Sequence, residues 1–257
     1  MKKILILYSA HYVNDFTIKQ YDKLCREIPE NYDIVWWLDD MCNVKLNQNI
    51  KHIIFPHNSI SCKYGWFNPM KYMETYFLEN EWFREYDYYW VIEYDVYFNG
   101  NWRNFFNTVD KYNEDLICSS LTMYNPGINI EFLKSDKFYN YFEKLFKSCL
   151  SIYRISNKGL NIIANYNECD IKNHIYEVYI PSIIYKNKLT LSSLNSERYI
   201  IEPNNHIYDY SISFINYHDD CGFIDDAVNT FWYNTTFYDE SKMNKPNKLY
   251  TRYKEKQ

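Results

Sequence analysis

The sequence is short of the residues that loosen or interrupt a fold. Its 257 residues include 5 glycines and 7 prolines, while apolar residues make up 47%. This composition excludes a disordered, collagen-like or linker-rich protein. A chain of this length can bury roughly 70–75% of the surface that it exposes when unfolded, so a sizeable core is available.

Disulfide, zinc and membrane-spanning patterns are also missing. The seven cysteines are odd in number and form no C-x-x-C pair, which is typical of reduced thiols in a cytosolic protein. No run reaches the ~18 uninterrupted apolar residues that a membrane span requires. The apolar run Ile4–Ala10 is minimal and lacks a small-residue cleavage pattern, so we interpret it as a first strand. We therefore expect a cytoplasmic protein.

The two best-known glycine-rich phosphate loops are absent. No G-x-G-x-x-G follows the first strand, and no G-x-x-x-x-G-K-[ST] occurs anywhere. The absence of these motifs argues against a dinucleotide-binding Rossmann protein and against a P-loop protein. Any bound phosphate must be neutralised in another way. The net charge of -5 lacks the basic footprint of nucleic-acid binding, so we expect no nucleic-acid partner.

What the sequence has in excess is tyrosine, with 29 residues in a chain that is 20% aromatic. One interpretation is compositional drift and core packing. The other is a sugar-binding surface, because aromatic rings stack on carbohydrate C–H faces and hydroxyls bond sugar oxygens. Composition alone does not separate the two.

The first half of the chain alternates strand-like and helix-like segments. Strands are predicted at 3–8, 32–38, 52–55, 88–93 and 115–119, and helices at 15–27, 69–81 and about 102–112. Near-continuous apolar strands separated by helices indicate a mostly parallel sheet that is covered on both faces. We therefore predict an α/β fold of the nucleotide-binding type.

The second half is less regular. It predicts strands at 128–132 and 189–194, a helix that Ser135 caps and that runs to about Leu150, and an apolar stretch at 174–185 in which Pro181 limits any helix interior. The tail from residue 242 to 257 is basic. Because no repeat or linker interrupts the chain, we expect one domain over residues 1–257.

The strongest local signal is the segment Trp90–Phe98, in which a hydrophobic strand ends in Glu93 and Asp95. Open α/β sheets bind ligands at the carboxyl ends of their strands. Side chains at i and i+2 share one strand face, so both carboxylates can approach one ion. Carboxylates suit Mg or Mn, which would neutralise a diphosphate leaving group. The other interpretation is a pair of acids in a strand-end turn.

With this motif the sequence resembles glycosyltransferases of the GT-A fold. Residues 89–102 are similar to a W-x-x-E-x-D-V-x-[FY]-x-G signature of glycosyltransferase-like proteins from fungi and bacteria, and Glu177–Ser182 is similar to their E-V-x-x-P-[ST] element. Fainter echoes lie at 229–233 and 249–253. The resemblance implies a Rossmann-like, mostly parallel central sheet, with a nucleotide-sugar-binding half over 1–120 and an acceptor half over 121–241.

The resemblance also implies roles for individual residues. Asp95 is the expected metal ligand, and Glu93 is expected to contact the ribose, or the metal through water. Glu177 is the expected general base of an inverting enzyme, because a sugar hydroxyl needs its proton removed as it attacks. A solvated carboxylate on a helix surface is the other interpretation of Glu177. His218 is a third expected metal ligand, unless it is a surface loop residue.

Other candidate residues follow the first two predicted strands. His11 and Asp15 stand where such folds contact the nucleotide base and ribose, although Asn14 or Asp15 also suits a helix N-cap. Asp39 and Asp40, at the end of the second strand, are expected to hydrogen-bond the base. This placement comes from chain position alone.

Trp66 and the basic tail complete the set. Trp66 is interpreted either as part of the donor or acceptor cleft or as a core residue. The tail carries Lys242, Lys245, Lys248, Arg252, Lys254 and Lys256. It is either a solvated terminus or an electrostatic contact with an anionic membrane surface, which would make the protein peripheral on the inner face of the membrane.

The leading hypothesis is a metal-dependent glycosyltransferase with Mn or Mg, a UDP-, GDP- or dTDP-sugar donor, and a saccharide or lipid-linked glycan acceptor. A CMP-sugar donor would need a metal less. A non-catalytic carbohydrate-binding protein and a nucleotidyltransferase are the alternatives, although the lack of an early Gly-rich phosphate loop argues against the latter.

Overall fold

The structure is a computed structural model of the chain. It describes residues 2–11, 13–40, 50–56, 69–94, 96–123, 142, 144–166, 176–194, 200–201, 207–208 and 248–250. All of the predicted first-half elements fall within these ranges.

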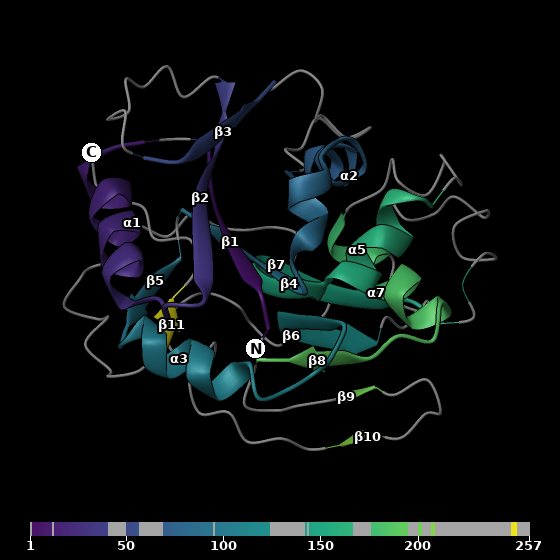
Figure 1. The fold of residues 1–257 in the computed structure, drawn as a ribbon. Helices are drawn as coiled ribbons and strands as arrows, with labels where there is room; N and C mark the ends of the chain where they lie inside the picture. The colour runs from purple at the N-terminus through teal and green to yellow at the C-terminus, as the bar shows by residue number, and fades with distance from the viewer. Residues whose placement is uncertain are drawn as a thin grey trace.

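A nine-stranded sheet runs through the molecule in the order β10-β9-β8-β6-β7-β4-β1-β2-β3. Its first-half strands are β1 (Ile4–Ala10), β2 (Tyr32–Asp39), β3 (His52–Phe55) and β4 (Tyr88–Glu93). These four strands are parallel, with β1 between β2 and β4 (Figure 1). Their carboxyl ends therefore meet at one edge of the sheet.

The second half of the sheet is mixed. β7 (Phe146–Ser156) pairs antiparallel with both β4 and β6 (Leu116–Met123), and β8 (Leu191–Ser193) is parallel to β6. The two-residue strands β9 (Ile200–Ile201) and β10 (Ile207–Tyr208) continue antiparallel beyond β8. A separate antiparallel pair joins β5 (Tyr97–Asn99) to β11 (Lys248–Tyr250).

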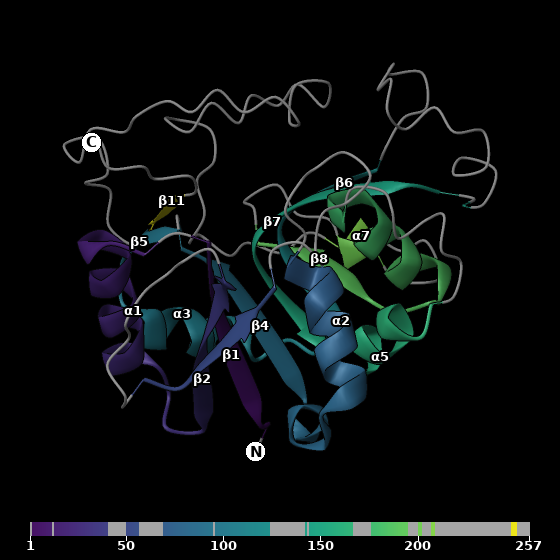
Figure 2. The same ribbon diagram turned by 90° about the horizontal axis from the view of Figure 1, so that it is seen from above.

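Helices cover both faces of the sheet. One face packs against α1 (Asp15–Glu27) and α3 (Trp102–Val109), and the other against α2 (Pro69–Glu79), the 3-10 helix η3 (Glu81–Glu85), α5 (Asn157–Ala164) and α7 (Tyr176–Lys186). Figure 2 shows α1 and α3 apart from α2, α5 and α7, with β1 and β4 between them. The predicted fold class, a Rossmann-like and mostly parallel α/β sheet flanked by helices as in the GT-A fold, is confirmed.

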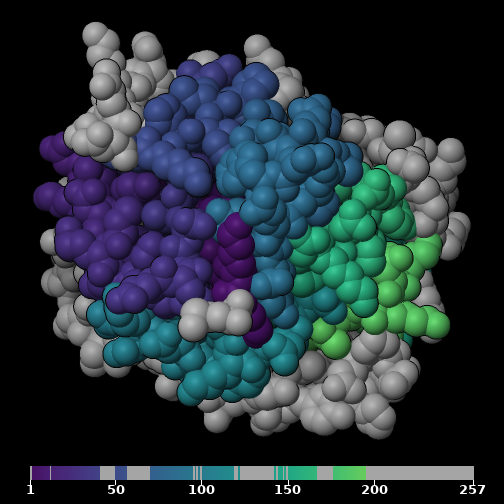
Figure 3. Space-filling model, in the orientation of Figure 1, coloured from purple at the N-terminus to yellow at the C-terminus, as the bar shows by residue number. Residues whose placement is uncertain are grey.

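Each face of the sheet has its own apolar core because strand side chains alternate. On β1, Leu5 and Leu7 pack toward α2 and α5, whereas Ile4 and Ile6 pack toward α1 and α3. In Figure 3 the purple N-terminal segments pack against the blue segment that carries α2, and green segments lie beyond it. Aromatic side chains such as Trp36, fully buried against Tyr21, fill much of these cores, so core packing accounts for many of the aromatic residues.

The predicted helix from Ser135 to about Leu150 is wrong where the structure describes it, because residues 142 and 144–150 are not helical. Residues 146–150 belong to β7, which takes its place between β4 and β6. A strand that is paired on both edges and covered on both faces carries apolar residues on both sides, which weakens its period of two. The part of this prediction at 135–141 and the strand predicted at 128–132 lie outside the described residues.

Pro181 lies inside α7 and does not end it, contrary to the expectation that it would limit a helix there. Proline has no N–H, so it leaves the carbonyl four residues earlier, that of Glu177, without its helical donor. The hydroxyl of Ser148, on the neighbouring β7, donates to this carbonyl over 3.2 Å. The sheet therefore supplies the hydrogen bond that the helix lacks.

Within the part of the chain that the structure describes, no helix is long and apolar enough to cross a membrane. Among the described residues, Cys25 and Cys118 form no disulfide, and Cys118 is buried. Cys42, Cys62, Cys169 and Cys221 lie outside the described residues.

Candidate functional site

The carboxyl ends of the parallel strands bring three predicted site residues to one edge of the sheet. In the register of β1 on β4, Ser9 lies opposite Glu93, and β1 leads directly to His11. Asp39 is the last residue of β2, on the other side of β1. His11, Asp39 and Glu93 therefore lie at the ends of three neighbouring strands, at the edge where open α/β sheets bind ligands.

Glu93 is half-buried on the sheet face that α2, α5 and α7 cover. It shares this face with Tyr89 and Val91, because alternate side chains of a strand point to one side. The hydroxyl of Tyr176, the first residue of α7, donates a hydrogen bond to Glu93 Oε1 over 3.2 Å. This bond attaches the start of α7 to the end of β4.

His11 meets the acidic motif through Tyr94, the residue between Glu93 and Asp95. The Tyr94 hydroxyl and His11 Nε2 lie 3.2 Å apart, and the two rings meet edge to face with centroids 4.7 Å apart. The Tyr94 N–H also donates to the carbonyl of Ser9 over 2.8 Å. The turn after β4 is therefore fixed to the end of β1, with the exposed His11 ring beside it.

A buried cluster of tyrosines and carboxylates lies behind Glu93. The Tyr179 hydroxyl, one turn after Tyr176 on α7, donates to Glu74 Oε1 of α2 over 3.1 Å. Tyr153 of β7 lies on the same face and is 1% exposed. Burial raises the pKa of Tyr153 far above its ordinary value, and the negative charges of Glu93 and Glu74 raise it further. Its hydroxyl has no hydrogen-bond partner among the described residues.

Glu74 was not among the residues singled out from the sequence, although a signal for it exists. The buried stripe of α2 is formed by Met70, Met73 and Phe77, and Glu74 occupies a position of the same stripe with 5% of its surface exposed. A carboxylate in the apolar stripe of a helix is rarely buried without a partner. Such a position is a detectable departure from the amphipathic pattern.

Glu177 is 7% exposed, in the first turn of α7, so its interpretation as a solvated surface carboxylate is wrong. Its neighbour Tyr176 contacts Glu93, which brings this turn of α7 to the end of β4. The general-base role of Glu177 stays a prediction.

The other residues that we predicted to contact the nucleotide differ in their exposure to solvent. Asp39 is 1% exposed, whereas Asp40, the next residue, is exposed. Asp15 is exposed in the first turn of α1, and Asn14 is the N-cap: the Thr17 N–H donates to Asn14 Oδ1, and the Asn14 N–H donates to Thr17 Oγ1, both over 2.9 Å. Asp15 is therefore not needed as a cap.

Asp95, Trp66 and His218 lie outside the described residues. Among the residues that the structure does describe, no group of three or more His, Cys, Asp or Glu side chains could hold a metal ion. Of the predicted metal ligands, the structure describes Glu93. Its carboxylate oxygen chemistry fits a hard divalent cation such as Mg or Mn.

Residues 248–250 of the basic tail pair with the strand that follows the acidic motif. In the antiparallel pair, Lys248 is opposite Asn99 and Tyr250 is opposite Tyr97, two residues after Asp95. The backbone at 248–250 is therefore joined to the strand that directly follows the motif. The rest of the tail from 242 to 257, to which the membrane contact was ascribed, lies outside the described residues.

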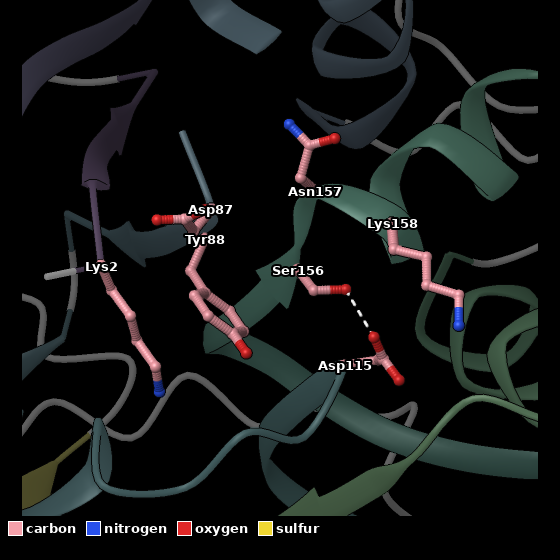
Figure 4. A pocket seen from close by; sticks show the side chains of 7 residues that line it. All are labelled: Lys2, Asp87, Tyr88, Asp115, Ser156, Asn157 and Lys158. Carbon is pink, nitrogen blue, oxygen red and sulfur yellow. Dashed lines mark hydrogen bonds between the residues drawn. The ribbon is translucent and has the colours of Figure 1, made fainter. Parts of the chain in front are cut away.

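A depression of about 560 Å³ lies at the opposite edge of the sheet, where Asp87 precedes β4 and Asp115 precedes β6 (Figure 4). Several of its polar groups are bonded within the fold: Ser156 Oγ donates to Asp115 Oδ1 over 2.8 Å, and the Lys3 N–H donates to Asp87 Oδ2 over 2.7 Å. These bonds tie elements of the fold together, so this depression is not the candidate site.

No protein-family model and no curated protein matches the sequence. Among solved structures, the chain is similar to a proposed glucose-1-phosphate thymidylyltransferase from Bacillus anthracis, with 13% identity, a TM-score of 0.45, and coverage of 79% of this chain and 90% of that one.

Two further solved structures are similar at the same level. The mannosyltransferase Ktr4p from S. cerevisiae has 14% identity, a TM-score of 0.41, and coverage of 71% of this chain and 65% of that one. HddC from Yersinia pseudotuberculosis has 12% identity, a TM-score of 0.40, and coverage of 79% of this chain and 93% of that one. At such identities and TM-scores, the likenesses assign no activity to this chain.

Proposed function

We propose that the protein is a metal-dependent glycosyltransferase that moves a sugar from a nucleotide-sugar donor to a saccharide or lipid-linked glycan. The observation that supports this proposal is the convergence at one edge of the sheet: His11 and Glu93 lie at the ends of adjacent strands, and Tyr176 joins the start of α7 to Glu93. The W-x-x-E-x-D-V pattern of the sequence falls at this edge.

In this proposal the acidic motif and His11 receive the donor. Glu93 and Asp95 would hold Mg or Mn, which supplies positive charge against the diphosphate as it leaves. His11 is exposed beside the motif, where its ring would stack on the base of a UDP-, GDP- or dTDP-sugar. Asp39 and Asp40, at the end of β2, would bond the same nucleotide.

Glu177 would act on the acceptor. The acceptor oxygen forms a bond to the anomeric carbon, the bond from this carbon to the diphosphate oxygen breaks, and the acceptor proton passes to the Glu177 carboxylate. A single displacement of this kind inverts the configuration at the anomeric carbon. The position of Glu177 next to Tyr176, which contacts Glu93, is what favours the role.

Calorimetric titration tests nucleotide binding. UDP, GDP, dTDP and CMP are titrated with and without Mn into the wild-type protein, Asp95→Asn and the control Asp22→Asn, which changes an exposed aspartate of α1. We expect one diphosphate to bind more tightly with Mn, and this increment to be lost in Asp95→Asn alone. Absence of binding for all four nucleotides would overturn the proposal and favour a non-catalytic carbohydrate-binding protein.

A product assay separates the two enzyme classes. A glycosyltransferase, given a nucleotide-sugar and an acceptor, releases the nucleoside diphosphate. A nucleotidyltransferase, given a nucleoside triphosphate and a sugar 1-phosphate, releases pyrophosphate. Release of pyrophosphate without transfer from nucleotide-sugars would contradict the proposal and assign the second class.

A further inference from the structure

The hydrogen bond between Tyr176 and Glu93 joins two segments that are far apart in the sequence. Glu93 ends β4 and Tyr176 begins α7, and the hydroxyl lies 3.2 Å from Oε1. Only one carboxylate oxygen takes part in this bond. An ionised carboxylate has two acceptor oxygens, so a glutamate can accept a hydrogen bond from a tyrosine and bind a further group.

A second tyrosine of α7, Tyr179, attaches the helix to α2. Tyr179 and Tyr176 are three residues apart, so they lie on one side of α7. Tyr179 donates to the buried Glu74 of α2, and the two bonds together attach one face of α7 to α2 and to β4. Tyr153, on β7, has both carboxylates among its electrostatic neighbours, which places Glu93 and Glu74 near the same point.

This arrangement limits the motion of Glu93. A free glutamate side chain samples several rotamers, whereas a carboxylate that accepts a hydrogen bond from a partly buried tyrosine is held in one. Functional carboxylates need support of this kind, because the residues behind a ligand set its orientation. Tyr176 itself stands one residue from Glu177, so the same bond sets the start of α7 relative to the acidic motif.

We propose that Tyr176 is a positioning residue: its hydroxyl holds the Glu93 carboxylate in the orientation that receives the cation, and it couples α7 to the acidic motif. This inference rests on the proposed function for its ligand. The Tyr176 hydroxyl does not react in it, and acts through Glu93.

The test compares Tyr176→Phe with Tyr86→Phe. Both variants keep the ring and remove a partly buried hydroxyl that donates to a carboxylate, since Tyr86 donates to Asp33 Oδ2 over 2.7 Å. Asp33 lies at the start of β2, away from the candidate site. UDP, GDP and dTDP are titrated calorimetrically with and without Mn, and thermal unfolding of both variants is recorded.

We expect Tyr176→Phe to reduce the Mn-dependent gain in affinity about tenfold, as the loss of a hydrogen bond to a charged group would. Its affinity for the metal-free nucleotide and that of Tyr86→Phe in either condition should stay at the wild-type level. A purely structural bond would instead change unfolding alone. Equal Mn-dependent affinities in the wild type and Tyr176→Phe would overturn the inference.

A second measurement separates this inference from the proposed function. If the wild type binds no nucleotide, the proposed function fails, and the contact is then tested by a thermal-unfolding double-mutant cycle of Tyr176→Phe and Glu93→Gln. Non-additive shifts in the midpoint support the coupling of Tyr176 to Glu93, whereas additive shifts overturn it.

Discussion

The Ser148 hydroxyl donates a hydrogen bond to the backbone carbonyl of Glu177, which Pro181 leaves without a helical donor. Ser148 is buried on β7, so water has little access to replace it. The bond allows an apolar helix with an internal proline to lie against the sheet. It also fixes the backbone of the residue that we propose as the base.

Ser148→Ala should lower the free energy of unfolding by about 1–3 kcal/mol, because the buried carbonyl of Glu177 would lose the hydroxyl that donates to it. Urea denaturation measures this loss. In a Pro181→Ala background the restored N–H can donate to the same carbonyl, so Ser148→Ala should lower the free energy of unfolding by less than it does with Pro181 in place. Equal losses in both backgrounds would show that the serine and the proline are independent.

Asp110→Ala should lower the free energy of unfolding by about 3–5 kcal/mol, because it removes the carboxylate that pairs with the buried guanidinium of Arg154. Arg154 Nη1 lies 2.6 Å from Asp110 Oδ1, and the Arg154 side chain is fully buried. Burial raises the pKa of Asp110, and the charge of Arg154 opposes this rise. Asp110→Ala with Arg154→Met should be more stable than Asp110→Ala alone in urea denaturation. A double variant that is less stable would contradict this account.

Glu114→Gln should be more stable than the wild type by a margin that grows as the pH rises. Burial raises the pKa of Glu114 above its ordinary value of 4.5, and Oε2 has no hydrogen-bond partner among the described residues. The folded protein therefore holds this proton to higher pH than the unfolded chain does, so wild-type stability is lost as the pH rises through the folded pKa. Urea denaturation from pH 4 upward checks the sign, and a difference that shrinks with pH would contradict it.

His11→Ala should weaken nucleotide binding about fivefold with and without Mn, as the loss of roughly 1 kcal/mol of contact would. The reason is that His11 lies beside the motif but is not a proposed metal ligand. The matched control is His52→Ala, which changes an exposed histidine of the edge strand β3 whose ring bonds the carbonyl of Ile50. Loss of affinity only in the presence of Mn would instead indicate a role at the metal.

Elements with strong local signals were predicted with their bounds. The helix over 15–27 has a capping box at Asn14 and Thr17, and the strands at 52–55 and 88–93 are apolar runs between polar residues. Caps and short apolar runs act within a few residues, so they can be identified without a partner. The same signals placed His11, Asp39 and Glu93 at strand ends, and the parallel sheet brought these ends together.

The contacts behind Glu93 could not be predicted in this way. Glu74 departs from the apolar stripe of α2, but nothing in its local sequence names Tyr179 as its donor, 105 residues away. Likewise, the pairing of β7 with both β4 and β6 depends on strands on either side of it. Pattern within one segment carries no information about which distant segment supplies the partner.

The sequence by itself determined the α/β class, the acidic motif and the placement of that motif at the end of a buried strand, because these depend on local periodicity. Only the tertiary structure decided that residues 146–156 form an antiparallel strand, that Ser148 supplies the hydrogen bond that Pro181 cannot, and that Tyr176 bonds Glu93. The physical reason is that buried polar groups must find partners, and those partners come from whichever elements the packed core brings beside them.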